Sequence, residues 1–151
     1  MKKKTKKTKS ELSRAPSANR FGVVREAHQT ETAEDYVELI AELIATKGEA
    51  RAIDISEALG VAHPTVTKTI ARLVRDGLAV KMPYRSIFLT EKGQAIAKRS
   101  RERHVIVRDF LRSIGVSPET AEIDSEGMEH HVSEETLNIF KKMTVRLKKG
   151  G

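Results

Sequence analysis

A short segment in the last third of the chain, residues 126–131, combines carboxylates with imidazoles. Glu126, Glu129 and His130 occupy positions i, i+3 and i+4, which lie on one face of an α-helix. Carboxylate oxygens and an imidazole nitrogen suit a divalent metal such as Mn²⁺, Fe²⁺ or Zn²⁺. A solvated acidic helix face has the same pattern. The segment therefore predicts a metal site if further ligands converge on it.

Two other segments carry residues of the same chemistry. Asp35 and Glu38, three residues apart at the edge of an apolar helical stripe, could share a cation or be ordinary surface acids. His104 lies three residues before the apolar stripe of a helix expected over 91–114, so it should point into the same interior. Because a lone inward histidine is more often a hydrogen-bonded core residue, its spacing leaves its function open.

These residues require elements to position them, and the pattern predicts a mainly α-helical chain with one small β-hairpin. Helices are expected over about 23–47 and 91–114, after the cap Ser117-Pro118 and after Ser133. Between the first two, residues 52–79 read as helix, turn, helix, and the runs 78–82 and 87–90 as the hairpin. This order indicates a winged helix-turn-helix followed by a helical domain.

The second helix of the helix-turn-helix has the composition of a DNA-recognition helix. Pro64 opens it, and Val66, Ile70, Leu73 and Val74 should face inward. Small hydroxyls and long cations, able to reach base edges and phosphates in a major groove, should face outward: Thr65, Thr67, Lys68, Arg72 and Arg75. Arg85, at the tip of the hairpin, would contact the phosphate backbone or the minor groove if the hairpin is a wing. A hairpin that only completes the core is the alternative.

The charge is divided along the chain. Residues 1–20 carry eight Lys/Arg against one Glu, residues 21–60 carry three basic against nine acidic side chains, and residues 61–101 carry nine against two. Two basic segments beside an acidic one are typical of a nucleic-acid-binding protein with a separate regulatory site. Residues 1–20 lack apolar periodicity, which predicts a disordered basic arm.

Composition excludes several classes of protein. The sequence has no cysteine, so it has neither a disulfide framework nor a thiolate site, which fits a reducing cytoplasm. No apolar run is long enough for a membrane span or a signal-peptide core. We therefore expect a soluble, unexported cytoplasmic protein with no membrane partner.

Four separated motifs in order resemble the manganese-responsive branch of the MntR/DtxR family of bacterial metal-dependent repressors, over nearly all of residues 25–141. The motifs are Asp35-Tyr36-Val37-Glu38, the turn and helix start of residues 61–68, Arg103-His104, and residues 126–131. The resemblance implies a homodimeric, Mn²⁺-activated transcriptional repressor of metal-uptake genes, with a winged helix-turn-helix domain, a helical dimerisation domain, and a palindromic double-stranded operator as its partner.

The resemblance also implies a ligand set. The ligands would be six: Asp35, Glu38, His104, Glu126, Glu129 and His130. In the family's binuclear arrangement Glu126 and Glu129 would bridge two ions per subunit, Asp35 and His130 would complete one site, and Glu38 and His104 the other. Iron-responsive relatives have sulfur ligands where this chain has Asp35 and Glu126, so the oxygens here favour Mn²⁺, although Fe²⁺ and Zn²⁺ should still bind.

The expected domains are a disordered basic arm over 1–20, a winged helix-turn-helix DNA-binding domain over 21–99, and a helical metal-binding and dimerisation domain over 100–151. We expect no SH3-like third domain of the kind found in iron-responsive relatives. Other readings are a winged-helix regulator that answers Fe, Zn or a small organic ligand, a dinuclear carboxylate enzyme, and an architectural DNA binder driven by the arm. The acidic–His cluster argues against an organic ligand, and an enzyme would have no use for the basic recognition helix.

Overall fold

The computed structural model describes residues 17–150, without the side chains of residues 17–20 and Arg85. The chain divides into two compact units, residues 1–32 and 33–151. Residues 1–16, most of the predicted basic arm, lie outside the described residues. Helix α1 (Ser17–Lys47) begins earlier than its predicted start near Val23, because a single glycine such as Gly22 costs a helix only about 1 kcal/mol relative to alanine.

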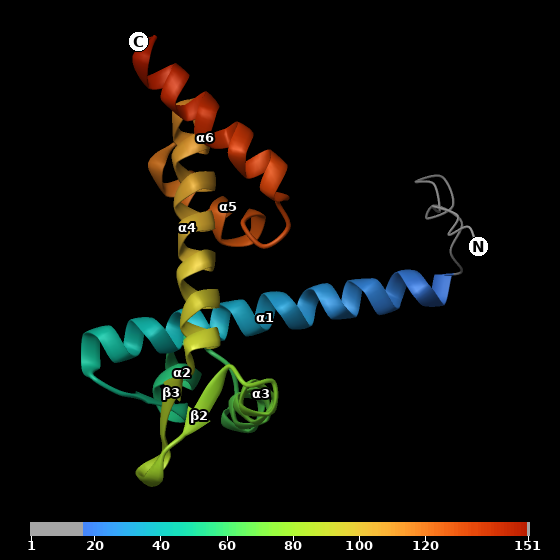
Figure 1. The fold of residues 1–151 in the computed structure, drawn as a ribbon, viewed down its shortest axis with the longest axis vertical. Helices are drawn as coiled ribbons and strands as arrows, with labels where there is room; N and C mark the ends of the chain where they lie inside the picture. Colours follow the sequence, from blue (N-terminus) through green and yellow to red (C-terminus); the bar gives the residue numbers. More distant parts are fainter. Residues whose placement is uncertain (1–16, 151) are drawn as a thin grey trace, which may run out of the picture. The chain divides into compact units, whose positions relative to one another are not determined.

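The predicted helix-turn-helix and hairpin are present in the second unit (Figure 1). The elements are β1 (Ala50–Arg51), α2 (Ala52–Leu59), α3 (His63–Arg75), β2 (Ala79–Lys81), the 3₁₀ turn η2 (Pro83–Arg85) and β3 (Ser86–Leu89). The strands form an antiparallel sheet in the order β1-β3-β2, with Ala50 opposite Ile87 and Ala79 opposite Leu89. β1 was not predicted, because two residues are too few to show a strand period.

The core of this region joins α1 to the helix-turn-helix and the sheet. Val37, Ile40, Ile55, Leu73 and Ile87 are almost fully buried in it. One prediction about an inward face was wrong, because Val74 on α3 is 40% exposed. Val66, Ile70 and Leu73 form the buried row of α3, whereas Val74 lines a surface pocket with Ile53 and Ala71.

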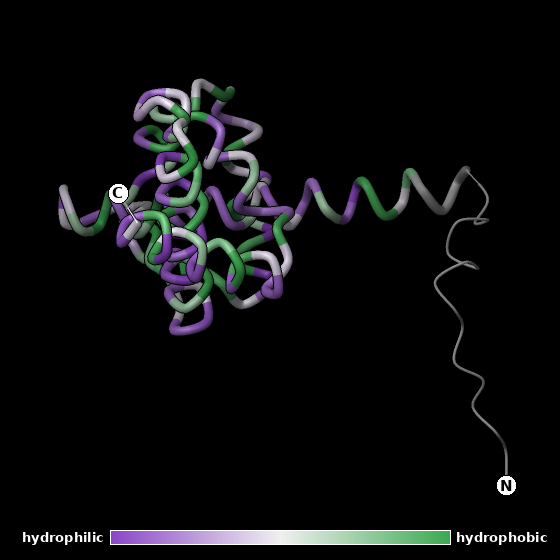
Figure 2. The backbone as a smooth tube through the Cα atoms, turned by 90° about the horizontal axis from the view of Figure 1, so that it is seen from above, coloured by the Kyte–Doolittle hydropathy of each residue, from purple (hydrophilic) through white to green (hydrophobic). Residues whose placement is uncertain are grey.

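Three helices form the rest of the second unit. α4 (Glu91–Ser113) packs against α5 (Pro118–Met128) and α6 (Glu134–Lys149). Val107, Leu111, Ala121 and Leu137 are buried between them, and the ring of Phe110 stacks on that of Phe140 at 4.0 Å between centroids. In Figure 2, hydrophobic and hydrophilic residues alternate along the tube, as amphipathic helices require. None of the described helices is long and apolar enough to cross a membrane.

A glycine allows α4 to approach the sheet closely. A Cβ atom at Gly93 would lie 2.0 Å from the carbonyl oxygen of Leu78 and 3.3 Å from the Cβ of Leu89. No side chain fits there unless the backbone moves. Since α4 also carries His104, this contact fixes the start of the helix that leads to the candidate metal centre.

Candidate metal centre

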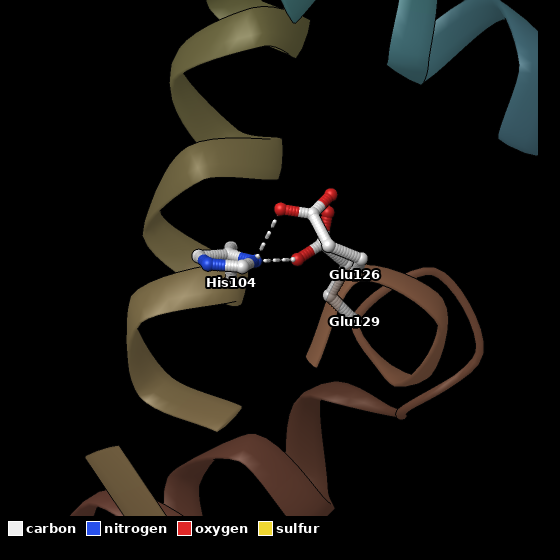
Figure 3. Close-up of side chains that lie close together, drawn as sticks. All are labelled: His104, Glu126 and Glu129. Atoms are coloured by element: carbon white, nitrogen blue, oxygen red, sulfur yellow. Dashed lines mark hydrogen bonds and ion pairs between the residues drawn. The ribbon is translucent and has the colours of Figure 1, made fainter. Parts of the chain in front are cut away.

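The side chain of Glu129 lies at the centre of a polar cluster between α4 and the end of α5. It is only 1% exposed, and its Oε2 lies 2.7 Å from Nδ1 of His104 (Figure 3). Its other oxygen, Oε1, lies 3.6 Å from Nε2 of His130. One buried carboxylate therefore faces both histidines that the sequence predicted as ligands.

His104 projects inward from α4, as predicted, and is buried. Its Nδ1 also lies 3.5 Å from Oε1 of Glu126. One ligand atom from each of His104, Glu126 and Glu129 lies within 4.8 Å of the other two, so these three residues could hold a metal ion. The opposite ring nitrogen, Nε2, lies 2.9 Å from Oε1 of Glu122, a residue that the sequence interpretation missed.

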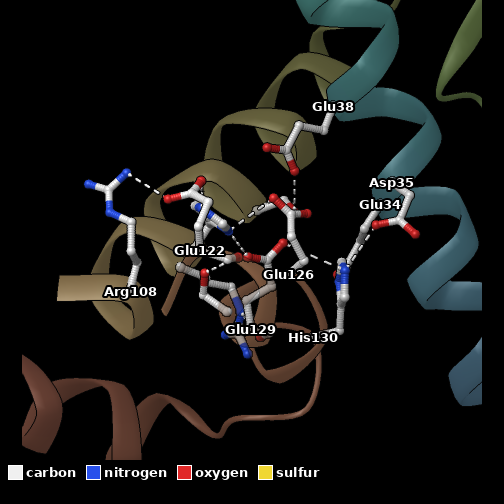
Figure 4. A network of polar contacts seen from close by, with 12 residues as sticks. Glu34, Asp35, Glu38, Arg108, Glu122, Glu126, Glu129 and His130 are labelled. Carbon is white, nitrogen blue, oxygen red and sulfur yellow. Dashed lines mark hydrogen bonds and ion pairs between the residues drawn. The ribbon is translucent and has the colours of Figure 1, made fainter. Parts of the chain in front are cut away.

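His130 links the end of α5 to α1. Its Nδ1 lies 2.6 Å from Oε2 of Glu34 and its Nε2 lies 3.0 Å from Oδ1 of Asp35 (Figure 4). The imidazole is almost fully buried, with 2% of the side chain exposed. The contact with Asp35 was expected from the predicted ligand set, but Glu34 had not been singled out.

The predicted helical face of residues 126–130 is only partly correct. α5 ends at Met128, Glu129 caps it, and His130 lies in the following turn, where the backbone N–H groups of His131 and Val132 donate to the carbonyl of Met128. Ser133 then caps the start of α6. As a result Glu126 is largely exposed, Glu129 is buried and His130 reaches α1, so these side chains approach the cluster from different directions.

Glu38 reaches the edge of the cluster from α1. Its Oε2 accepts a hydrogen bond of 3.0 Å from the hydroxyl of Ser100 on α4. Its negative charge contributes to the raised pKa of Glu129. Glu38 thus faces the same interior as His104 and Glu129, but its hydrogen bond goes to Ser100.

Arg103 holds the turn that carries Glu129 and His130. Its guanidinium, 14% exposed, donates from Nε to the backbone carbonyl of Glu129 at 2.8 Å and from Nη2 to that of Val132. Its Nη1 lies 3.0 Å from Oε1 of Glu134 at the start of α6. The arginine that precedes His104 therefore positions the segment opposite it.

The electrostatics of the cluster are those of crowded carboxylates. Burial raises the pKa of Glu129 to about 7, although the neighbouring His104 acts in the opposite direction. Contacts with Asp35 and Glu34 raise the pKa of His130 to about 10. Burial lowers the pKa of His104, but its hydrogen bond to Glu122 and the charges of Glu129 and Glu126 outweigh burial and raise it. Added positive charge is therefore favoured here.

The residues present fit a divalent metal. All six predicted ligands supply oxygen or nitrogen, the donors that Mn²⁺ accepts. Among the described residues, the buried Nε2 of His130 has no hydrogen-bond partner, although Asp35 and Glu129 surround it. A buried polar atom without such a partner is costly in a native protein unless a ligand satisfies it.

The predicted DNA-contacting side chains of α3 mostly lie on its outer face. Thr65, Thr67, Lys68 and Arg75 are exposed, and Arg72 is half-buried. The side chain of Arg85 lies outside the part of the chain that the structure describes. Its neighbour Tyr84 is 90% exposed, with a φ of 66°.

Comparisons with known proteins agree with this arrangement. The N-terminal DNA-binding domain of iron-dependent repressors matches residues 28–87, and their metal-binding and dimerisation domain matches residues 90–149. The transcriptional regulator MntR of Escherichia coli O6:H1 is 55% identical over 124 residues, which are 82% of this chain and 80% of that protein. The chain belongs to the MntR family. Its relatives are transcriptional regulators, which confirms the expectation of a DNA-binding regulator rather than an enzyme.

Solved structures of the MntR family's relatives share the fold. T. acidophilum IdeR matches with a TM-score of 0.67 and 30% identity over 73% of this chain and 52% of its own. The manganese regulator SloR matches with a TM-score of 0.66 and 26% identity over 74% of this chain and 52% of its own. The chain spans about half the length of these two proteins. The winged helix-turn-helix fold with an attached helical domain is therefore confirmed.

Proposed function

We propose that this chain is a Mn²⁺-activated transcriptional repressor that binds a palindromic operator as a homodimer and controls metal-uptake genes. The observation that carries the proposal is the convergence of Asp35 from α1, His104 from α4, and Glu129 with His130 from the end of α5. The kinship with MntR regulators and with the manganese regulator SloR supports the choice of metal.

Six residues would hold two ions per subunit: Asp35, Glu38, His104, Glu126, Glu129 and His130. Bound Mn²⁺ would supply positive charge that offsets the repulsion between these crowded carboxylates. The protein's own residues then link α1, which packs in the core of the DNA-binding region, to α4 and α5 in the helical region. With the link made, the two recognition helices of a dimer would keep the spacing of successive major grooves.

Exposed apolar side chains support the homodimer. On α6 Ile139 and Met143, which are four residues apart and share a helix face, are 52% and 36% exposed. Exposed apolar side chains on one helix face are typical of protein interfaces. The matching family domain is itself a dimerisation domain. In the proposed division, the DNA-binding part covers residues 21–99 and the metal-binding and dimerisation part covers residues 100–151. Both α5 and α6 belong to the second part.

A gel-shift experiment tests the proposed function. Three duplexes would be compared in Mn²⁺ and in excess chelator: a palindromic operator, its single half-site and a scrambled sequence of equal length. We expect a stable complex only for the palindrome with Mn²⁺, because both recognition helices must be placed together. Equal retardation of all three duplexes would show a non-specific DNA binder and would overturn the proposal.

The number of ions is tested separately by electron paramagnetic resonance, which counts free Mn²⁺ during a titration of the protein. Wild type should bind two ions per subunit. Asp35→Asn should weaken one ion and Glu38→Gln the other, because each residue belongs to a different proposed site. A single ion in wild type, or loss of the same ion in both variants, would contradict the binuclear assignment.

A further inference from the structure

Each histidine of the cluster has one ring nitrogen facing the proposed ligands and the other held by a carboxylate outside that set. For His104, Nδ1 faces Glu129 at 2.7 Å while Nε2 meets Glu122 at 2.9 Å. For His130 the arrangement is reversed, since Nε2 faces Asp35 at 3.0 Å while Nδ1 meets Glu34 at 2.6 Å. Figure 4 shows the two outer carboxylates on opposite sides of the network.

We propose that Glu122 and Glu34 are positioning residues of the metal centre, which select opposite ring nitrogens as ligands: Nδ1 of His104 and Nε2 of His130. This inference rests on the proposed function and deepens it. A neutral imidazole that binds a metal through one nitrogen carries a proton on the other. The group that accepts a hydrogen bond from this N–H fixes both the tautomer and the orientation of the ring.

The surroundings of Glu122 agree with this assignment. Its side chain is 54% exposed and lies on the α5 side of His104. Its second oxygen, Oε2, is 3.8 Å from Nη1 of Arg108 on α4. The two oxygens of Glu122 thus lie near two groups of α4, the imidazole of His104 and the guanidinium of Arg108, although the side chain is about half exposed.

The surroundings of Glu34 serve the other histidine. Glu34 precedes Asp35 on α1, and its side chain is 27% exposed. The two successive acidic residues reach the two nitrogens of the same buried ring. In the proposed tautomer, Nδ1–H donates a hydrogen bond to Glu34. Nε2, which has no hydrogen-bond partner among the described residues, then faces Asp35 and Glu129.

The test reads out which nitrogen binds metal. Protein with ¹⁵N-labelled histidine is loaded with ¹¹³Cd²⁺, a diamagnetic probe for the site, and long-range proton–nitrogen spectra are recorded. In wild type we expect cadmium coupling at Nδ1 of His104 and at Nε2 of His130. Glu122→Ala should abolish the cadmium coupling at Nδ1 of His104 or split it between the two ring nitrogens, and Glu34→Ala should do the same for His130. Each variant should also weaken Cd²⁺ binding about 10- to 100-fold, as measured by calorimetry.

Conservative variants separate positioning from general damage. Glu122→Gln and Glu34→Gln keep a carbonyl acceptor at the same place, so each should preserve the wild-type coupling and recover most of the affinity. Asp124→Asn removes an exposed charge from α5 without an imidazole contact and should leave coupling and affinity unchanged. These results together would support the inference.

Other results overturn it. If wild type shows the expected couplings while both alanine variants retain them at full affinity, Glu122 and Glu34 do not position the rings and only this inference fails. If an alanine variant loses one cadmium ion completely, its carboxylate is itself a ligand. If wild type binds cadmium with no coupling to either histidine, the ligand set of the proposed function fails as well.

Discussion

Asp35 on α1 and His130 beyond the end of α5 meet with 3.0 Å between Oδ1 and Nε2. The two residues are far apart in the sequence, and each lies in a different matched domain of the family. A side chain in the DNA-binding domain is therefore in direct contact with one in the metal-binding and dimerisation domain. In the proposed function, this contact is where metal occupancy would be coupled to DNA binding.

Asp35→Met should change the metal selectivity of the regulator. A carboxylate oxygen is a hard donor that suits Mn²⁺, whereas a thioether favours softer metals. Activation of operator binding by Mn²⁺ should fall more than activation by Fe²⁺ or Co²⁺, as measured by fluorescence anisotropy with each metal. Unfolding would remove the response to every metal together. An equal loss for all metals, or no loss, would mean that Asp35 does not tune the site.

Lys68→Ala tests whether α3 reads DNA. Lys68 is exposed on the outer face of α3, and loss of a base contact should weaken operator binding by about 1–3 kcal/mol and change sequence preference. The matched control is Lys98→Ala, which removes an equally long cation from α4 at a side chain that is 80% exposed. Equal effects of both variants on operator and random DNA would indicate that Lys68 adds only general charge.

Ile139→Glu tests the apolar face of α6. The side chain is 52% exposed in the single chain, and a buried charge at a subunit interface is strongly unfavourable. Sedimentation velocity should show a shift from dimer to monomer. Asn138→Glu places the same charge on the neighbouring, exposed position of α6 and should remain dimeric. A dimeric Ile139→Glu would exclude this face of α6 from the interface.

Gly93→Ala tests the close contact between α4 and the sheet. The added Cβ would meet the carbonyl oxygen of Leu78 at 2.0 Å, and such overpacking typically costs about 1–3 kcal/mol of stability. Urea unfolding should show a lower midpoint. Gly22→Ala, a helical position with no atom within 4 Å of the new Cβ, should be neutral or stabilising. A wild-type midpoint for Gly93→Ala would show that α4 can shift without cost.

Residue spacing predicted the elements of the fold and the inward direction of His104, because helical periodicity and caps are local properties. The family resemblance placed Asp35 beside His130 and His104 beside Glu129, and both contacts are present, whereas Glu38 hydrogen-bonds to Ser100. The sequence did not reveal β1, whose two residues are ordered by pairing with β3. It also overestimated the buried face of α3, because the exposure of Val74 depends on tertiary packing, which helical spacing alone does not determine.

Within the site, the sequence did not single out the two outer carboxylates, Glu34 and Glu122. Glu34 and Glu122 are acids on acid-rich helices, and their spacing does not distinguish them from solvated residues. Their importance depends on the turn after Met128, which carries His130 to α1, and on the rotation of α4, which turns Nε2 of His104 toward Glu122. These are tertiary relationships. Glu122 stands one helical turn before Glu126, and Glu34 beside Asp35, so adjacency to predicted ligands is the only local signal.

The most direct test of the account is a fluorescence-anisotropy titration of a labelled palindromic operator, with and without Mn²⁺, for wild type and Glu129→Gln. Glu129 is the buried carboxylate that faces both histidines, and glutamine keeps its shape while it removes the charge. We expect Mn²⁺ to tighten operator binding by wild type on the order of 10- to 100-fold. The variant should bind as metal-free wild type does at every Mn²⁺ concentration. Tight operator binding by wild type in excess chelator, or a full Mn²⁺ response from Glu129→Gln, would contradict the account.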